Sequence, residues 1–234
     1  MMMQWAIEDT QSPVVPVCST PESSWRSRLG DFLTVVPPQL YPPGVALLKQ
    51  GQNCREVYLI EKGLVKLIHS SHKGKEFIIG IRSPGRVLGA NSIILDVAYP
   101  ATAVTLTHCN LVRVPAGMFL QSLASDPSLS TYVQYEESRD AYEGMVKLCG
   151  LACLSARERL EELLCELALA LTHLDGEKPA RFRLPLKHWE MAELISVTPQ
   201  HLSKLLKELQ REGVLEVSKG YLALNRPHGL TGQM

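Results

Sequence analysis

The sequence predicts an α+β protein in which an antiparallel β domain, one long helix and a small helical domain with a β-hairpin follow one another. Short β-rich runs separated by glycines fill residues 41–114, a pattern typical of an antiparallel sandwich or barrel. Apolar side chains then recur every three and four residues over residues 132–153, which indicates a long helix. Two short amphipathic helices and two strands are predicted in residues 188–224.

The composition is that of an ordinary globular protein, with 45% hydrophobic and 21% charged residues. The 24 basic residues balance the 24 acidic ones, which excludes a strongly basic arm or an acidic tail. Binding to nucleic acid would therefore need a local basic face. The sequence has no apolar run long enough for a membrane span and does not begin like a secretory signal. We expect a cytoplasmic protein with reduced cysteines and no membrane partner.

The β domain is assigned to residues 25–125 and follows a leader of 24 residues. Residues 1–24 are polar and lack periodicity, which predicts an irregular segment, and a short helix is expected over residues 25–32. A hairpin turn is expected at Ser71 to Gly74, because glycine accepts a positive φ. The strands are predicted at residues 57–60, 64–68, 77–79 and 102–106.

Residues 126–153 are predicted to form the long helix, capped by Asp126 or Ser128 around Pro127. Its repeat starts at Tyr132. The stripe must be buried against its own domain or against a second copy of the chain, and we favour a second copy, hence a homodimer. The predicted dimer interface is Tyr135, Arg139, Tyr142, Val146, Cys149 and Cys153.

The cysteines are expected to be small packing residues. The six of them form no C-x-x-C pair, and no secretory signal favours disulfides. A redox or metal role for Cys149 and Cys153, four residues apart on one helical face, is the alternative.

Residues 154–234 are assigned to the third domain. Ser155 and Glu158 form a predicted capping box for a helix that ends near Leu174. Together with the joint at residues 152–154, this helix is the expected hinge between the domains. Residues 181–184 alternate like a strand.

Residues 188–224 carry the pattern of a winged helix-turn-helix. Thr198 is a natural N-cap and Pro199 a natural first helical residue, so a second helix starts there after a tight turn. Gly213 ends that helix, and strands at residues 214–217 and 221–224 form the wing. The core-facing side chains of the two helices are Met191, Leu194, Ile195, Leu202, Leu205, Leu206 and Leu209.

The polar face of the second helix has the chemistry to read duplex DNA. Gln200 can bond an adenine edge in two places, Lys204 can donate to guanine, and Ser203 lies between them. The predicted phosphate contacts are Lys187, His188, His201, Lys207 and Lys219. The alternative is a winged helix used for protein contacts, because Glu208 and Glu212 leave the patch only modestly basic.

With these motifs, residues 26–226 resemble the Crp/Fnr family of bacterial transcription regulators. The β-domain motifs are Tyr41 to Gly44, Gln50-Gly51, Val57 to Gly63, Gly74 to Glu76 and Pro84 to Gly89. The resemblance implies a cyclic-nucleotide-binding-like β roll, a dimerisation helix and a C-terminal winged helix-turn-helix. It also implies a homodimer on a near-palindromic duplex, with RNA polymerase as a further partner.

The residues that hold cyclic AMP in this family are missing. Members that bind it carry Gly-Glu and, about ten residues later, Arg-Ser, whereas this chain has Gly89-Ala90 and Tyr99-Pro100. The Thr-Ser pair on the helix aligns near Gly144-Met145. A different effector, or none, is therefore expected. Its pocket would be lined by Gly89, Ala90, Asn91, Ser92, Tyr99, Pro100, Ala101, Thr102, Tyr135 and Tyr142.

Other inputs and activities fit the residues less well, and we expect no metal and no cofactor. An iron–sulfur cluster normally needs four thiolates, and the leader has only Cys18. His69, His72 and His108 could ligate haem but are more simply surface or core residues. No catalytic motif of a hydrolase, a nucleotide-binding enzyme or a cupin is present, so we expect no enzyme. A redox- or haem-responsive regulator, or an interaction module whose DNA binding has lapsed, is the alternative.

The recognition helix also departs from the family. Many members carry Glu followed by Ser-Arg, where this chain has Gln200 with Ser203 and Lys204. Lysine lacks the bidentate fork of arginine, and glutamine favours adenine. We therefore expect a half-site that differs from the commonest one in the family.

Overall fold

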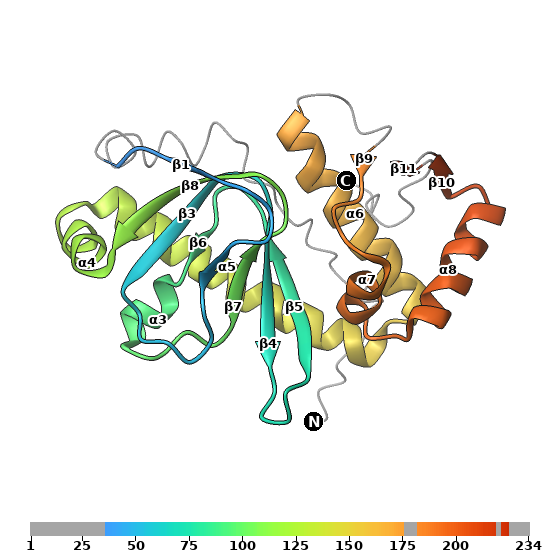
Figure 1. Cartoon of the computed structure of the whole chain (residues 1–234), viewed down its shortest axis with the longest axis horizontal. Coiled ribbons are helices and arrows are strands. Elements are labelled where there is room, and N and C mark those ends of the chain that lie inside the picture. Colours follow the sequence, from blue (N-terminus) through green and yellow to red (C-terminus); the bar gives the residue numbers. More distant parts are fainter. Residues whose placement is uncertain (1–35, 176–181, 219–220, 225–234) are drawn as a thin grey trace, which may run out of the picture.

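The computed structural model describes residues 36–175, 182–218 and 221–224. The predicted leader with Cys18, the short helix over residues 25–32 and Lys219 lie outside these residues. The β domain lies to the left in Figure 1 and the C-terminal helical domain to the right. The structure confirms the α+β class and the order of β domain, long helix and winged helix-turn-helix.

Two antiparallel four-stranded sheets form the β domain. One has the order β1-β8-β3-β6 and the other β2-β7-β4-β5, and the β4–β5 hairpin projects from the body of the domain (Figure 1). Gly63, at φ 94°, shows why glycine is needed at a turn, since a Cβ there would lie 2.4 Å from the carbonyl oxygen of His108. The strands are β1 (Gln39–Tyr41), β2 (Ala46–Leu48), β3 (Glu56–Lys62), β4 (Val65–Ser70), β5 (Glu76–Arg82), β6 (Val87–Leu88), β7 (Thr102–Thr105) and β8 (Cys109–Pro115).

Two short helices interrupt the β pattern and were not predicted. They are α3 (Ala90–Leu95), which follows Gly89 directly, and α4 (Ala116–Ser125), which leads from β8 toward the long helix. Ile93 of α3 and Phe119 of α4 are buried in the same core as Leu129 and Val133. The two helices therefore close one end of the β domain and support the start of the long helix.

The long helix is α5 (Pro127–Cys153), and its start is capped as predicted. The Asp126 carboxylate accepts hydrogen bonds from the backbone N–H groups of Ser128 and Leu129, at 2.8 and 3.2 Å. Tyr132 does not belong to the exposed stripe, because it is 1% exposed and its hydroxyl donates to the carbonyl of Gly85. The first turns of α5 thus pack on the β domain, which corrects the predicted start of the repeat.

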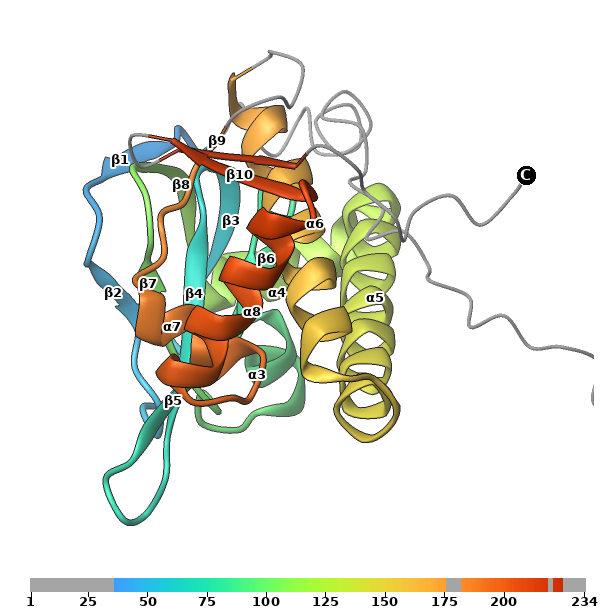
Figure 2. The same cartoon turned by 90° about the vertical axis from the view of Figure 1, so that its right-hand side faces the viewer.

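The C-terminal domain contains α6 (Ala156–Asp175), α7 (His188–Leu194) and α8 (Pro199–Arg211), with a small sheet of order β10-β11-β9. Figure 2 shows α8 at the front, with α7 to its left over the β strands and α6 and α5 to its right. The strands are β9 (Phe182–Arg183), β10 (Leu215–Ser218) and β11 (Tyr221–Leu224), so the predicted hairpin is present and the predicted strand at 181–184 joins it.

The joint between α5 and α6 is shorter than predicted. Ala152 and Cys153 still belong to α5, and only Leu154 and Ser155 separate it from α6. The capping box is present, since Glu158 accepts a hydrogen bond from the backbone N–H of Ser155 at 2.7 Å. The two helices therefore change direction over two residues.

Candidate DNA interface

The second helix of the predicted motif, α8, is held by its first turn and its apolar stripe. The Thr198 hydroxyl accepts a hydrogen bond from the backbone N–H of His201 at 3.2 Å, and Pro199 is the first helical residue. Leu202, Leu205 and Leu209 are buried. The opposite face of α8 is therefore left to solvent, as the sequence predicted.

The three predicted base-reading residues lie on that face. Gln200 and Lys204 are exposed, one turn apart, whereas Ser203 is half-buried. The Ser203 hydroxyl donates to the carbonyl of Pro199 at 3.1 Å and lies 3.2 Å from Nε2 of His188. With its proton engaged inside α8, Ser203 offers an acceptor rather than a donor to a base edge.

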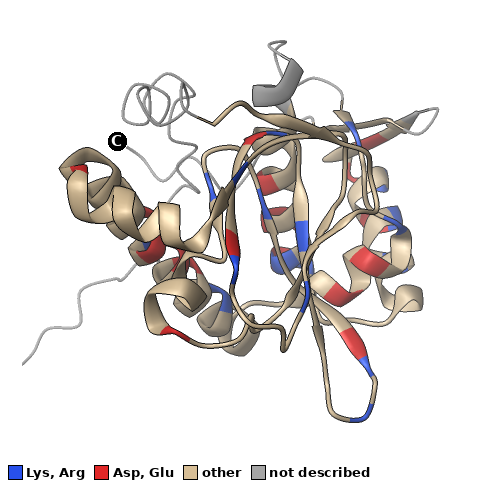
Figure 3. Cartoon of the chain, turned by 60° about the vertical axis from the view of Figure 1, so that its left-hand side comes forward, with Lys and Arg blue, Asp and Glu red and all other residues tan. Residues whose placement is uncertain are grey.

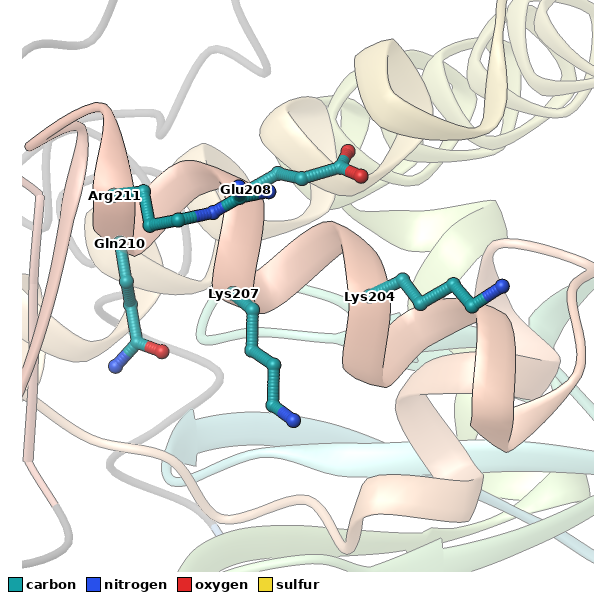
Figure 4. Close-up of a pocket in the computed structure, with 5 residues that line it drawn as sticks. All are labelled: Lys204, Lys207, Glu208, Gln210 and Arg211. Atoms are coloured by element: carbon teal, nitrogen blue, oxygen red, sulfur yellow. The ribbon is translucent and has the colours of Figure 1, made fainter.

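The predicted phosphate-contacting residues surround these three. Lys187, His188, His201 and Lys207 are exposed, and the neighbouring Trp189 is 46% exposed. Figure 4 shows a shallow hollow on α8 lined by Lys204, Lys207, Glu208, Gln210 and Arg211. Lys207 and Gln210 extend to one side of the helix and Glu208 to the other. Basic and acidic positions are interspersed over the described part of the chain (Figure 3).

Two arginines of α6 hold the ends of α7 and α8 in place. Arg157 binds both oxygens of Glu212 at the end of α8, at 2.8 and 2.6 Å. This contact lowers the pKa of Glu212 and pairs one of the acids that weaken the basic patch. Arg159 donates to the carbonyls of Ile195 and Leu154, at 3.0 and 2.6 Å, and so ties the end of α7 to the joint between α5 and α6. The contacts of Arg157 with Glu212 and of Arg159 with Ile195 join distant residues, and the sequence carries no local signal for them.

The helices α6, α7 and α8 of the C-terminal domain pack against the β domain. Glu190 of α7, 2% exposed, forms an ion pair with Lys66 of β4, and its other oxygen accepts from the backbone N–H of Lys187 at 2.7 Å. Leu64 and Ile78 of the β domain belong to the same apolar core as α6, α7 and α8. An ion pair and a shared apolar core therefore join α7 to the β domain.

The residues of the predicted effector pocket are not gathered on one surface. Tyr99 is 5% exposed, and its hydroxyl donates to the carbonyl of Glu56 at 2.6 Å. A Cβ on Gly89, at φ 84°, would lie 2.9 Å from the Tyr99 ring, which explains the glycine. Ala90, Ser92 and Ala101 are buried and Thr102 is half-buried, whereas Gly89 is half-exposed and Asn91, Pro100, Tyr135 and Tyr142 are exposed.

A buried ion-pair network joins the β domain to α5, and sequence reasoning missed it. Arg86, 5% exposed, binds the carboxylates of Asp140 and Glu143, and Arg82 Nε lies 3.2 Å from Asp140. Arg139 Nη2 lies 2.7 Å from Glu136. Its sequence signal is Arg86, which lies inside the β-domain motif that ends at Gly89.

Glu136 is the most buried acid of this network, 3% exposed. Burial raises its pKa to about 7, against the opposing effect of Arg139 and Arg86. Arg139, predicted at the dimer interface, turns toward Glu136 and Glu143 with 11% of its side chain exposed. It therefore flanks the exposed stripe of α5 instead of forming its centre.

The exposed stripe of α5 contains the other predicted interface residues. Tyr135, Tyr142 and Val146 are 40%, 41% and 40% exposed, and Cys149 and Cys153 are exposed free thiols. Met145, 63% exposed, borders this apolar surface and was not predicted. Leu148 and Leu151 are also exposed, but helical geometry places them on other faces of α5.

The histidines discussed for haem lie apart from any metal-binding arrangement. His69 Nδ1 lies 3.0 Å from the carbonyl of Pro100, and the ring packs against Phe77, while His72 and His108 are exposed. Among the residues that the structure describes, no group of three or more His, Cys, Asp or Glu side chains is arranged to hold a metal ion. In the same part of the chain, no helix has the length and hydrophobicity to cross a membrane.

Comparison with known proteins agrees with this architecture. Residues 38–126 match the cyclic nucleotide-binding domain family and residues 158–232 the Crp-like helix-turn-helix domain family. The anaerobic regulatory protein of Pasteurella multocida is 24% identical over 179 residues, which cover 76% of this chain and 65% of that protein. The cAMP-activated global transcriptional regulator CRP of Salmonella typhimurium is 22% identical, over 75% of this chain and 83% of its own.

Solved structures share the fold. FixK2 from Bradyrhizobium japonicum superimposes with a TM-score of 0.71 at 16% identity, covering 82% of this chain and 94% of its own. The c-di-GMP responsive regulator CLP of Xanthomonas campestris superimposes with a TM-score of 0.68 at 21% identity, covering 85% of this chain and 98% of its own. With both family models matched in the expected order, the chain belongs to the Crp/Fnr family of DNA-binding transcription regulators.

Proposed function

We propose that this chain acts in the cytoplasm as a homodimeric, sequence-specific transcription regulator that binds a near-palindromic duplex and works with RNA polymerase. The observation that carries the proposal is the solvent-facing polar side of α8, with Gln200 and Lys204 exposed on a capped helix whose C-terminal end Arg157 holds through Glu212. A helix presented in this way can enter the major groove with its N-terminal residues at the base edges.

Dimerisation through α5 would place two such helices on one duplex. The exposed apolar stripe around Tyr142 and Val146 is the surface for the second copy. Two recognition helices related by a two-fold axis then meet successive major grooves about 34–36 Å apart, one helical turn of DNA.

We further propose that DNA binding needs no cyclic nucleotide. The Gly-Glu and Arg-Ser ligands are replaced by Gly89-Ala90 and Tyr99-Pro100. Arg86 is a buried cation of the β domain, but its guanidinium is already bound by Asp140 and Glu143 of α5. A phosphate would have to displace these half-buried carboxylates and break their ion pairs with Arg86, which is unfavourable.

Fluorescence anisotropy with a labelled duplex tests the DNA interface. If Lys187, Lys207 and Lys219 of both subunits contact phosphates, log K should fall with log[salt] at a slope of about −5. Adding cyclic AMP should change neither affinity nor slope. Lys204→Glu with Lys207→Glu should abolish binding, whereas Lys75→Glu on the exposed β4–β5 hairpin should leave it intact.

A salt-independent, weak association of the folded protein would support the interaction module instead. Binding only in the presence of cyclic AMP would contradict the proposal for the β domain while leaving the DNA interface in place.

A further inference from the structure

The cysteines of α5 lie along the middle of its exposed stripe. At about 100° per residue, Cys149 and Cys153 lie about 20° to either side of the line through Tyr142. Glu136, which faces the β domain, lies about 120° away from that line. Both thiols are free and exposed near the C-terminal end of the helix. They therefore occupy the centre of the surface that a second copy would cover.

In a parallel helix pair these positions meet their symmetry mates. Packed helices have axes about 8–10 Å apart, and Cα atoms lie about 2.3 Å from each axis. For residues about 20° off the line between the axes, the mates' Cα atoms are then about 4–6 Å apart. A disulfide needs about 4.4–6.8 Å between Cα atoms. Cys149 and Cys153 both meet this requirement.

We infer that Cys149 and Cys153 form reversible disulfides with the same residues of a second subunit, so that oxidation joins the two copies covalently. The inference rests on the proposed homodimer. A bond within one helix is disfavoured, because side chains four residues apart have Cβ atoms about 5–6 Å apart whereas a disulfide needs about 3.5–4.5 Å. The cross-link therefore forms between chains while α5 stays helical.

The oxidant would be hydrogen peroxide. A thiolate attacks one peroxide oxygen, the O–O bond breaks, and a sulfenic acid and one water form. The thiol of the second subunit then attacks the sulfenic sulfur, expels the second water and closes the S–S bond. Two thiols lose two electrons and two protons, and the peroxide is reduced to two waters.

The position of the bond gives it a consequence for DNA binding. Cys153 is the last residue of α5, and Leu154 and Ser155 lead directly into α6. A bond at this point holds the subunits together where the two C-terminal domains begin. A tethered partner has an effective concentration in the millimolar range, so the dimer should persist at dilutions at which the reduced protein dissociates.

The test is treatment of the full chain with hydrogen peroxide, followed by denaturing electrophoresis without reductant and by sedimentation. We expect a covalent dimer that dithiothreitol reverses, with peptide masses linking Cys149 to Cys149 and Cys153 to Cys153. Each single serine variant should still cross-link, Cys149→Ser with Cys153→Ser should not, and the control Cys165→Ser on α6 should behave as wild type. The oxidised wild type should stay dimeric at low-nanomolar concentration.

Three results would overturn the inference. A protein that sediments as a dimer but forms no covalent dimer refutes it and leaves the proposed function standing. A cross-link that survives in the double serine variant, or a mass that links Cys149 to Cys153 within one chain, refutes it as well. A monomer before and after oxidation refutes the proposed homodimer and the inference together.

Discussion

Replacing Arg86 by Gln should strongly destabilise the protein. The guanidinium is 5% exposed and binds Asp140 and Glu143 of α5, with Glu136 3.6 Å away. Removing one partner of a buried ion pair costs about 3–5 kcal/mol, because the remaining charges stay buried without compensation. Asp140 and Glu143 keep 27% and 29% of their side chains exposed, so water can reach them. We therefore expect the lower end, about 3 kcal/mol.

Urea unfolding followed by circular dichroism measures this loss. With a slope of about 2–3 kcal/mol/M, the midpoint should fall by about 1–1.5 M. The control is Arg113→Gln, because Arg113 pairs with Glu56 at 2.5 Å but keeps 52% of its side chain exposed, and it should cost less than about 1 kcal/mol. Adding Asp140→Asn to the Arg86→Gln variant should restore part of the stability. Equal midpoints for the two single arginine variants would refute the argument that the network is buried.

Three further changes test other parts of the molecule. Gln200→Ala should relax the base preference in each half-site, with a loss of about 1–3 kcal/mol of binding free energy per specific contact. Lys207→Ala should weaken binding to all sequences alike, and competition binding with single-base variants of the duplex distinguishes the two effects. Val146→Asp should give a monomer in sedimentation, whereas Leu120→Asp, at a similarly exposed position of α4, should stay dimeric; a dimeric Val146→Asp protein would remove α5 from the interface. The pKa of Glu136 is raised to about 7, so the folded state binds the proton of this carboxyl more tightly than the unfolded state does. The contribution of Glu136 to the free energy of unfolding should therefore fall by about 3 kcal/mol as the pH rises from about 4.5 to 7. Glu136→Gln should flatten this dependence in unfolding curves between pH 5 and 8, and an unchanged pH profile would contradict it.

The features predicted correctly from the sequence are those fixed by neighbouring residues. Asp126 with Pro127 marks the start of α5, and Thr198 with Pro199 marks the start of α8, because capping is a contact over two or three residues. The apolar stripe of α8 follows from helical periodicity alone. These signals identified the winged helix and its exposed polar face.

The features that were missed depend on contacts between distant residues. Arg86 meets partners on α5 that lie 54 and 57 residues away, and Lys66 meets Glu190 across 124 residues. Periodicity could not assign Tyr132 to the β-domain core, because one helix carries two neighbouring apolar stripes and only one of them packs on the β domain. The short helix α3 also follows from packing on the β domain rather than from a strong local pattern.

Selection from a random duplex pool by the reduced protein, without added ligand, tests the central claim most directly. The account predicts enrichment of an inverted repeat whose half-sites are centred about 10–10.5 base pairs apart, with altered preference when Gln200 is replaced by Ala. Protein shown to be folded and dimeric that enriches no sequence, or that enriches a single site without symmetry, would contradict it.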